Sequence, residues 1–233
     1  MRLINTIKYD VLSQFRYGFY YAYIAILILY YGLLTNIPTE LRNEIEVLII
    51  FSDPSAVGYF IIGGILLLEK DQNTMENLFV TPIRIYEYIF SKVISLTLLA
   101  VLITIIILLT TWDGPLHLFT LLLGVILTSI FFTLLGLTAA VYSNSLNEYL
   151  LKAPLIVSVF YLPVLEYLNI YHHPLFNIIP GKASLVLLEG GFEELEPLSL
   201  VYAVATLSAW IVLAYMLAHR SFYKRIILRI EGR

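Results

Sequence analysis

The sequence predicts an all-α polytopic membrane protein with six transmembrane helices. Its 233 residues are 60% hydrophobic and 13% charged, and the mean hydropathy is +0.86. Soluble domains are roughly 45–50% apolar and about 25% charged. A hydrocarbon core about 30 Å thick is crossed by roughly 20 apolar residues of helix. We therefore expect one transmembrane domain over 1–233, with spans near 18–36, 46–68, 93–112, 117–142, 153–168 and 198–219.

The second and fifth spans are interrupted by proline. In the second span, Pro54 fits the first turn of a helix that Asp53 caps. We expect a new helix to begin there, with 46–52 as a separate short piece. The fifth span is short and contains Pro154 and Pro163.

The distribution of Lys and Arg predicts the orientation. If the N-terminus is cytoplasmic, the inner segments hold twelve of the fourteen Lys and Arg residues, and only Arg42 and Lys182 lie outside. Membrane proteins show this positive-inside bias. Both termini are therefore expected on the cytoplasmic side.

The first 17 residues predict an amphipathic helix that lies in the membrane interface. Its apolar residues recur at helical spacing, and they are Leu3, Ile4, Ile7, Val11, Leu12 and Phe15. The segment is too polar for a cleaved signal peptide. The alternative is a frayed terminus.

The segment 171–197, between the fifth and sixth spans, predicts two short outer helices that re-enter the membrane. It is too apolar at 175–188 for a solvated loop, and Pro180-Gly181 divides it. Irregular backbone at membrane depth is tolerated only when it is buried against protein. We therefore expect this re-entrant segment to pack on other spans.

Between the second and third spans, residues 69–92 are polar and charged. Thr81-Pro82 predicts a helix start, and Met75, Leu78 and Phe79 predict a small apolar face on the turn before it. A short helix with an apolar face and a charged rim can dock into a groove of another protein. The alternative is a linker whose apolar face rests on lipid.

The run EKDQNTMENLFVTPIRIYEYIFSK, 69–92, resembles the signature of type-2 permeases of ATP-binding-cassette exporters. The signature has a Glu at the end of span two, Thr-x-Glu-x-Leu, Ser/Thr-Pro and a Lys entering span three. The layout is similar over essentially the whole chain, and HPLFNIIPGKASLVLLEGG, 173–191, is similar to the family's segment before the last span. Fluoroquinolone-export permeases are the most similar type by overall pattern.

The resemblance implies that 69–92 is a coupling helix that docks on an ATPase subunit. Carried over by position, the docking residues are Glu69, Thr74, Met75, Glu76, Leu78, Phe79, Thr81 and Pro82. The sequence departs from the family at Asn73-Thr74, where Gly-Thr is common.

The resemblance also implies which molecules the chain works with. The chain has no phosphate-binding loop of the G-x-x-x-x-G-K-[ST] kind, and PGKAS at 180–184 lacks the upstream glycine. ATP and Mg²⁺ therefore belong to a partner ATPase, and this chain is expected to bind no cofactor and to have no catalytic residue. The other expected partners are a second permease copy or paralogue and the lipid of a prokaryotic cytoplasmic membrane, with no nucleic acid.

Polar groups within spans are candidate substrate contacts, because an unpaired one is costly in lipid. The candidates are Asp53, Glu166, Tyr23, Thr128 and Thr133. Helix packing is the alternative for the threonines, and an interfacial aromatic belt for the tyrosine.

Two other classes of protein compete with a drug exporter. An intramembrane enzyme would need paired polar groups at membrane depth, which the spans do not offer. No metal site is expected, because adjacent residues of an extended segment, such as His172 and His173, point apart. A non-transporting membrane anchor or immunity protein stays open, and so does the identity of the substrate.

Overall fold

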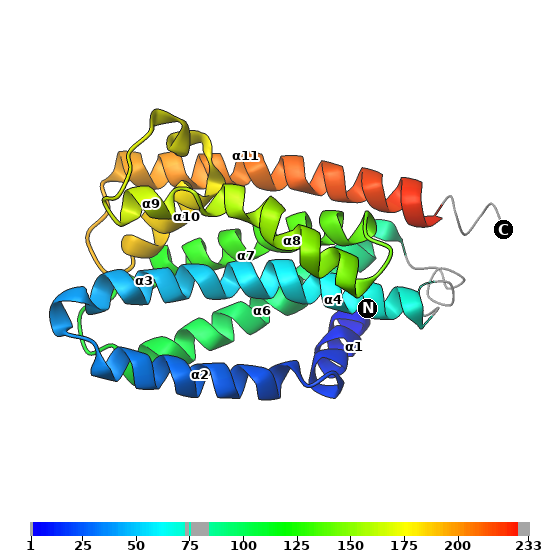
Figure 1. Cartoon of the computed structure of the whole chain (residues 1–233), viewed down its shortest axis with the longest axis horizontal. Coiled ribbons are helices and arrows are strands. Elements are labelled where there is room, and N and C mark those ends of the chain that lie inside the picture. The colour runs from blue at the N-terminus through cyan, green and yellow to red at the C-terminus, as the bar shows by residue number, and fades with distance from the viewer. Residues whose placement is uncertain (1, 73–74, 76–83, 228–233) are drawn as a thin grey trace.

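A computed structural model of the chain describes residues 2–72, 75 and 84–227. Long helices lie side by side in a bundle, and within these residues no strand is present (Figure 1). The elements are α1 (Arg2–Arg16), α2 (Phe19–Asn36), α3 (Thr39–Ala56), the π-helix η1 (Val57–Ile61), α4 (Ile62–Asp71), α6 (Ile85–Thr111), α7 (Leu118–Val141), α8 (Leu146–Tyr161), α9 (Val164–Tyr167), the 3₁₀-helix η2 (Pro174–Ile178), α10 (Pro180–Glu189), α11 (Pro197–Phe222) and the π-helix η3 (Tyr223–Ile227).

Five helices among the described residues are long and apolar enough to cross a membrane. They are Phe19–Asn36, Leu41–Asp71, Ile85–Thr111, Leu118–Val141 and Pro197–Ile227. The predicted fifth span corresponds to α8, which has 16 residues, and to α9 beyond Pro163. In Figure 1 α8 runs along the bundle from the end that carries α1 toward the end that carries α9. The sixth crossing stays a prediction.

The expected break at Asp53-Pro54 is wrong, because the helix continues through Pro54 as α3. Pro54 has no N–H to donate. The Ser55 hydroxyl donates to the carbonyls of Phe51 and Ser52, 2.8 and 3.0 Å away, and so bonds backbone oxygens in this turn. The irregularity instead lies one turn later, in the π-helix η1.

The N-terminal segment is a helix, α1, that lies across one end of the bundle and packs on α6 (Figure 1). Gly18 follows it with φ of 79°, a left-handed conformation that glycine adopts without strain, and it separates α1 from α2. Ile4, Leu12 and Phe15, which belong to the predicted apolar face, are exposed, whereas Asp10 is buried. The helix therefore turns apolar residues outward and a carboxylate into the bundle.

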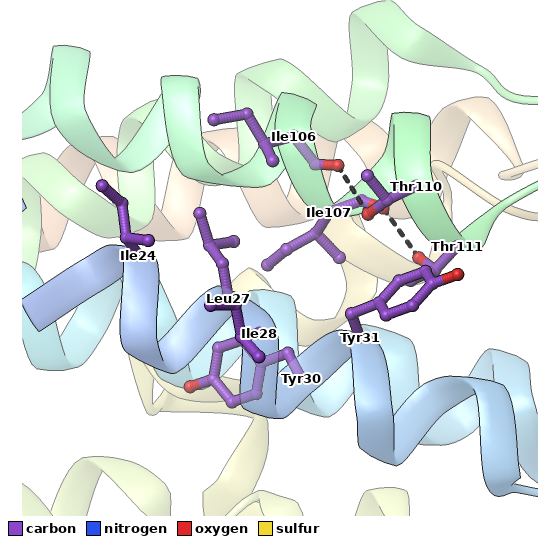
Figure 2. A pocket seen from close by; sticks show the side chains of 9 residues that line it. All are labelled: Ile24, Leu27, Ile28, Tyr30, Tyr31, Ile106, Ile107, Thr110 and Thr111. Atoms are coloured by element: carbon purple, nitrogen blue, oxygen red, sulfur yellow. Dashed lines mark hydrogen bonds between the residues drawn. The ribbon is translucent and has the colours of Figure 1, made fainter. Parts of the chain in front are cut away.

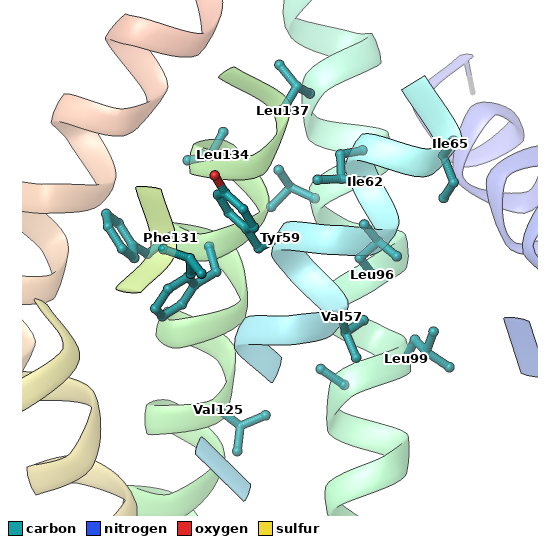
Figure 3. Close-up of a cluster of buried hydrophobic side chains, with 14 of the residues drawn as sticks. Val57, Tyr59, Ile62, Ile65, Leu96, Leu99, Val125, Phe131, Leu134 and Leu137 are labelled. Carbon is teal, nitrogen blue, oxygen red and sulfur yellow. The ribbon is translucent and has the colours of Figure 1, made fainter. Parts of the chain in front are cut away.

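The core is centred on α7, which packs on α3, η1, α4, α6, α10 and α11. Figure 3 shows side chains of η1, α4 and α7, among them Tyr59, Ile62 and Leu137, filling the space between these helices. The helices approach closely at Gly136, because a Cβ there would lie 2.4 Å from the Tyr59 carbonyl oxygen. Small residues at helix contacts are typical of membrane bundles.

The segment between α9 and α11 folds back onto the bundle at the end opposite α1 (Figure 1). Helix α10 packs on α3, α7 and α11. The Trp210 indole donates to the Ile178 carbonyl at 2.8 Å, and the Tyr202 hydroxyl donates to the Asn177 carbonyl at 2.6 Å. The expectation that this segment packs on other spans is confirmed, and its depth in a membrane stays a prediction.

Candidate functional site

The end of the bundle where α1 lies, which we call the terminal end, also holds the last turn of α4 and the first turns of α6 (Figure 1). These two helices flank the polar segment that resembles a coupling helix. Three charged side chains are buried here, namely Asp10, Glu69 and Lys92, with 3%, 6% and 2% exposure. We call these three residues the ion cluster.

Lys92 is the centre of the ion cluster. Its ammonium group lies 2.7 Å from the Asp10 carboxylate and also pairs with the Glu69 carboxylate. The second oxygen of Glu69 accepts a hydrogen bond of 2.6 Å from the Tyr88 hydroxyl. One lysine thus joins the N-terminal helix α1 to the end of α4.

Because the ion cluster is buried, its stability depends on the ion pairs between its charged groups. An unpaired charge in the interior costs several kcal/mol, and removal of one partner of a buried pair leaves that penalty uncompensated. Burial raises the pKa of Asp10, while Lys92 opposes the rise and the Glu69 charge adds to it. Lys92 is therefore the group that allows two carboxylates to be buried together.

Further contacts attach the ion cluster to the rest of the terminal end. The Gln14 side chain of α1 donates to the Ser95 hydroxyl of α6 at 3.0 Å. The Tyr88 ring packs on Phe222 of α11, with ring centroids 5.1 Å apart. The flanks of the polar segment are consequently fixed to several helices of the bundle.

The predicted docking residues divide into two groups. Glu69 is buried in the ion cluster, and Met75 is buried against the hydrophobic core. Thr74, Glu76, Leu78, Phe79, Thr81 and Pro82 lie outside the described residues. A docking role for any of these positions stays a prediction.

Two of the predicted substrate residues lie near each other. Asp53 of α3 is 3% exposed, and Tyr23 of α2 is close enough to interact electrostatically with its carboxyl. Thr128 and Thr133 of α7 are fully buried, and a Cβ on Gly58 of η1 would lie 2.8 Å from the Thr133 hydroxyl. Thr133 therefore lies where η1 and α7 pack tightly.

Glu166 lies at the opposite end of the bundle, apart from the other candidates (Figure 1). It pairs with Lys182 of α10, and the His172 ring nitrogen lies 3.7 Å from its carboxylate. His173 accepts a hydrogen bond from the Leu175 amide at 3.2 Å and so caps η2. In the described part of the chain, no group of three or more His, Asp or Glu could hold a metal ion.

Sequence reasoning did not identify Asp10 and Tyr88 as site residues, nor Tyr30 and Tyr161, which lie near Asp53. Asp10 lies four residues before Gln14 and therefore on the same face of α1, and both are buried. The available signal was that Asp10 is the only acidic residue in this amphipathic helix. The tyrosines gave no signal, because the chain has 18 of them.

Comparison with known proteins identifies one family for this chain. A model of the fluoroquinolones export permease protein family matches residues 1–230. Two curated relatives, the fluoroquinolones export permease proteins of Mycobacterium tuberculosis strains CDC 1551 / Oshkosh and ATCC 25618 / H37Rv, are each 25% identical over 206 residues. The match covers 87% of this chain and 87% of each relative. No solved structure matches the chain.

Proposed function

The chain belongs to the fluoroquinolones export permease protein family, and from that premise we propose that it is the membrane-spanning subunit of an ATP-binding-cassette exporter. Its helices are long and apolar enough to cross a membrane. The exported molecule is a small amphipathic compound, and fluoroquinolones are the first class to test because two relatives carry that name.

In this proposal the terminal end of the bundle faces the cytoplasm and the membrane is the prokaryotic cytoplasmic membrane. The asymmetry of Lys and Arg along the sequence supports this orientation. The cationic side chains near α1, the end of α4 and η3 then lie beside the anionic inner leaflet.

A separate ATPase subunit supplies the energy. It binds ATP and Mg²⁺, and the segment between α4 and α6 docks into its surface. A second permease copy or a paralogue completes the transport path, and this chain carries out no chemistry itself.

The observation that carries the proposal is that the two helices flanking this segment are joined to each other and to α1. Glu69 at one end of the segment and Lys92 beyond its other end share one buried ion pair. Packed interiors transmit displacement because they deform little. A docked ATPase that moves the segment would therefore move α4, α6 and α1 together.

The competing function is a membrane anchor or immunity protein that binds a partner without transport. It predicts no ATPase partner and no dependence on the segment between α4 and α6. The two functions are distinguished by purifying the chain from its own cells in mild detergent, identifying the proteins that accompany it and measuring their ATPase rate.

The informative variant is Glu76→Lys with Leu78→Asp, which alters the expected docking surface without changing a span. Its matched control is Glu194→Lys, which makes the same charge reversal at an exposed site at the opposite end. We expect a stoichiometric ATPase with the wild type and the control, and its loss with the double variant. If no ATPase accompanies the wild type, the anchor function replaces this proposal.

A further inference from the structure

Asp53 is a buried carboxyl group without a partner for one of its oxygens. Its side chain is 3% exposed, and Oδ2 has no hydrogen-bond partner among the described residues. The residue lies twelve positions after Leu41, where the candidate span begins, which is about 18 Å of helix at 1.5 Å per residue. An ionisable group at such depth is expensive and is a functional candidate by default.

Three tyrosines of two other helices lie near this carboxyl, and the hydroxyl of one, Tyr161, shares a hydrogen bond with the hydroxyl of Ser55, two residues after Asp53. Tyr23 and Tyr30 of α2 are seven residues apart and so lie on one face, two turns from each other. Tyr161 ends α8, and its ring packs on Phe51 of α3 at 5.0 Å between centroids. All three are close enough to Asp53 for electrostatic interaction, yet none donates a hydrogen bond to Oδ2.

A carboxylate among aromatic rings is suited to one class of ligand. The faces of aromatic rings attract cations, and a carboxylate accepts charge-assisted hydrogen bonds from an ammonium group. Glu46, the other buried acid on α3, also has one oxygen, Oε2, without a hydrogen-bond partner among the described residues, but its other oxygen accepts a hydrogen bond of 2.7 Å from the Thr111 hydroxyl.

An apolar groove shares one residue, Tyr30, with this site. It has a volume of about 250 Å³, lies between α2 and α6, and is lined by residues that include Ile24, Ile28 and Ile106. Tyr30 forms part of its wall, and in Figure 2 its ring lies on the side of α2 away from Ile106. Pockets for drug-sized ligands have volumes of about 300–1,000 Å³, so the groove accommodates part of such a ligand.

We propose that Asp53, with Tyr23, Tyr30 and Tyr161, binds the ammonium group of the exported molecule, whose apolar body extends past Tyr30 and around α2 into the groove between α2 and α6. This rests on the proposed function, since it identifies the substrate class as amphipathic amines. The ligand reaches Asp53 from the side of α2. Only Tyr23 and Leu34 of this helix are buried, and the rest of it is partly or fully exposed. The negative charge of Asp53 favours a ligand with an ammonium group over a neutral lipid.

The test is ligand binding to the purified chain in lipid nanodiscs, without an ATPase. The probes are a quinolone with a basic piperazine ring and its N-acetyl derivative, which lacks the positive charge. We expect the wild type to bind the basic probe at least about tenfold more tightly, as one charge-assisted hydrogen bond would give. Asp53→Asn should remove this preference and leave the affinity for the N-acetyl probe unchanged, whereas the control Glu46→Gln should retain the preference.

Three results would overturn the proposal: equal affinity of the wild type for both probes, no binding of either, or a preference that survives Asp53→Asn. A second variant, Ile28→Trp, fills the groove and should weaken both probes alike. If it instead dissociates a dimer and leaves binding unchanged, the groove holds a second copy of the chain and the placement of the ligand body is wrong.

The outcome is separable from that of the proposed function. A chain that recruits an ATPase but shows no charge preference keeps the proposed function and loses this inference. A chain that prefers the basic probe but recruits no ATPase does the reverse.

Discussion

The ion cluster and the Asp53 site are both buried acidic sites, and they differ in pairing. In the ion cluster, Lys92 pairs with Asp10 and Glu69. Asp10 keeps one oxygen without a partner but is paired through the other, whereas the Asp53 carboxyl makes no hydrogen bond or ion pair among the described residues. A paired cluster can fix the relative positions of helices, whereas an unpaired carboxyl can accept a cationic ligand.

The largest expected effect is that of Lys92→Met, which keeps the length of the side chain but leaves two carboxylates buried without a cation. Breaking a buried pair in this way costs about 3–5 kcal/mol. The free energy of unfolding, measured by denaturant titration in detergent, should fall by that amount. Lys152→Met is the control, since Lys152 pairs with Glu148 at an exposed site and its loss should leave stability unchanged. A small effect of Lys92→Met would show that the ion cluster does not hold the helices together.

A smaller effect is expected for Tyr88→Phe, which removes the hydroxyl that donates to Glu69. A hydrogen bond to a charged group contributes about 1.5–3 kcal/mol. The ring contact with Phe222 is retained, so the loss reports the hydrogen bond alone. Unchanged unfolding of this variant would contradict the assignment of Tyr88 to the ion cluster.

The pH dependence of stability should distinguish Asp10 from an exposed acid. Burial raises the folded-state pKa of Asp10 above 3.8. The folded protein therefore holds this proton more tightly than the unfolded chain, so the stabilisation from Asp10 is full below pH 3.8 and is lost as pH rises through the folded pKa. Comparing the thermal midpoint of wild type and Asp10→Asn across the acidic range should show a decline that the variant lacks. A rise with pH that Asp10→Asn abolishes would reverse the sign and contradict this description.

The smallest expected effect on stability is that of Asp53→Asn. No hydrogen bond to Oδ2 is lost, because none is made among the described residues. Replacing an ionisable group with a neutral amide should leave the free energy of unfolding within about 1 kcal/mol of the wild type, on the stabilising side. A clear destabilisation in the same denaturant titration would indicate that Asp53 is structural.

The spans could be predicted from the sequence because hydropathy depends on composition alone. The predicted 18–36 and 117–142 correspond to Phe19–Asn36 and Leu118–Val141. The proline at 54 misled the prediction, because local rules favour a helix start there, whereas tertiary packing keeps the helix continuous and places the irregularity in η1.

The candidate sites were harder to predict, because periodicity shows which residues share a face and not what that face contacts. Glu69 was recognised, but the other members of the ion cluster, Asp10 and Lys92, are separated from it by 59 and 23 residues in sequence, as 69 − 10 and 92 − 69. Asp53 was recognised by its charge. Tyr30 and Tyr161 were not, because only the packing of α2 and α8 distinguishes them from the other tyrosines.

The most direct test of the contrast between the two sites measures ATP hydrolysis and probe transport together, in vesicles that contain the permease and its ATPase. If the ion cluster couples the two subunits, Tyr88→Phe should lower transport of the basic and the N-acetyl quinolone alike for each ATP hydrolysed. If Asp53 binds the ammonium group, Asp53→Asn should keep the ATPase rate and lose transport of the basic probe selectively. Two results would contradict the assignment of coupling to the ion cluster and of ligand binding to Asp53. One is the same transport defect in both variants, and the other is a selective loss of basic-probe transport with Tyr88→Phe.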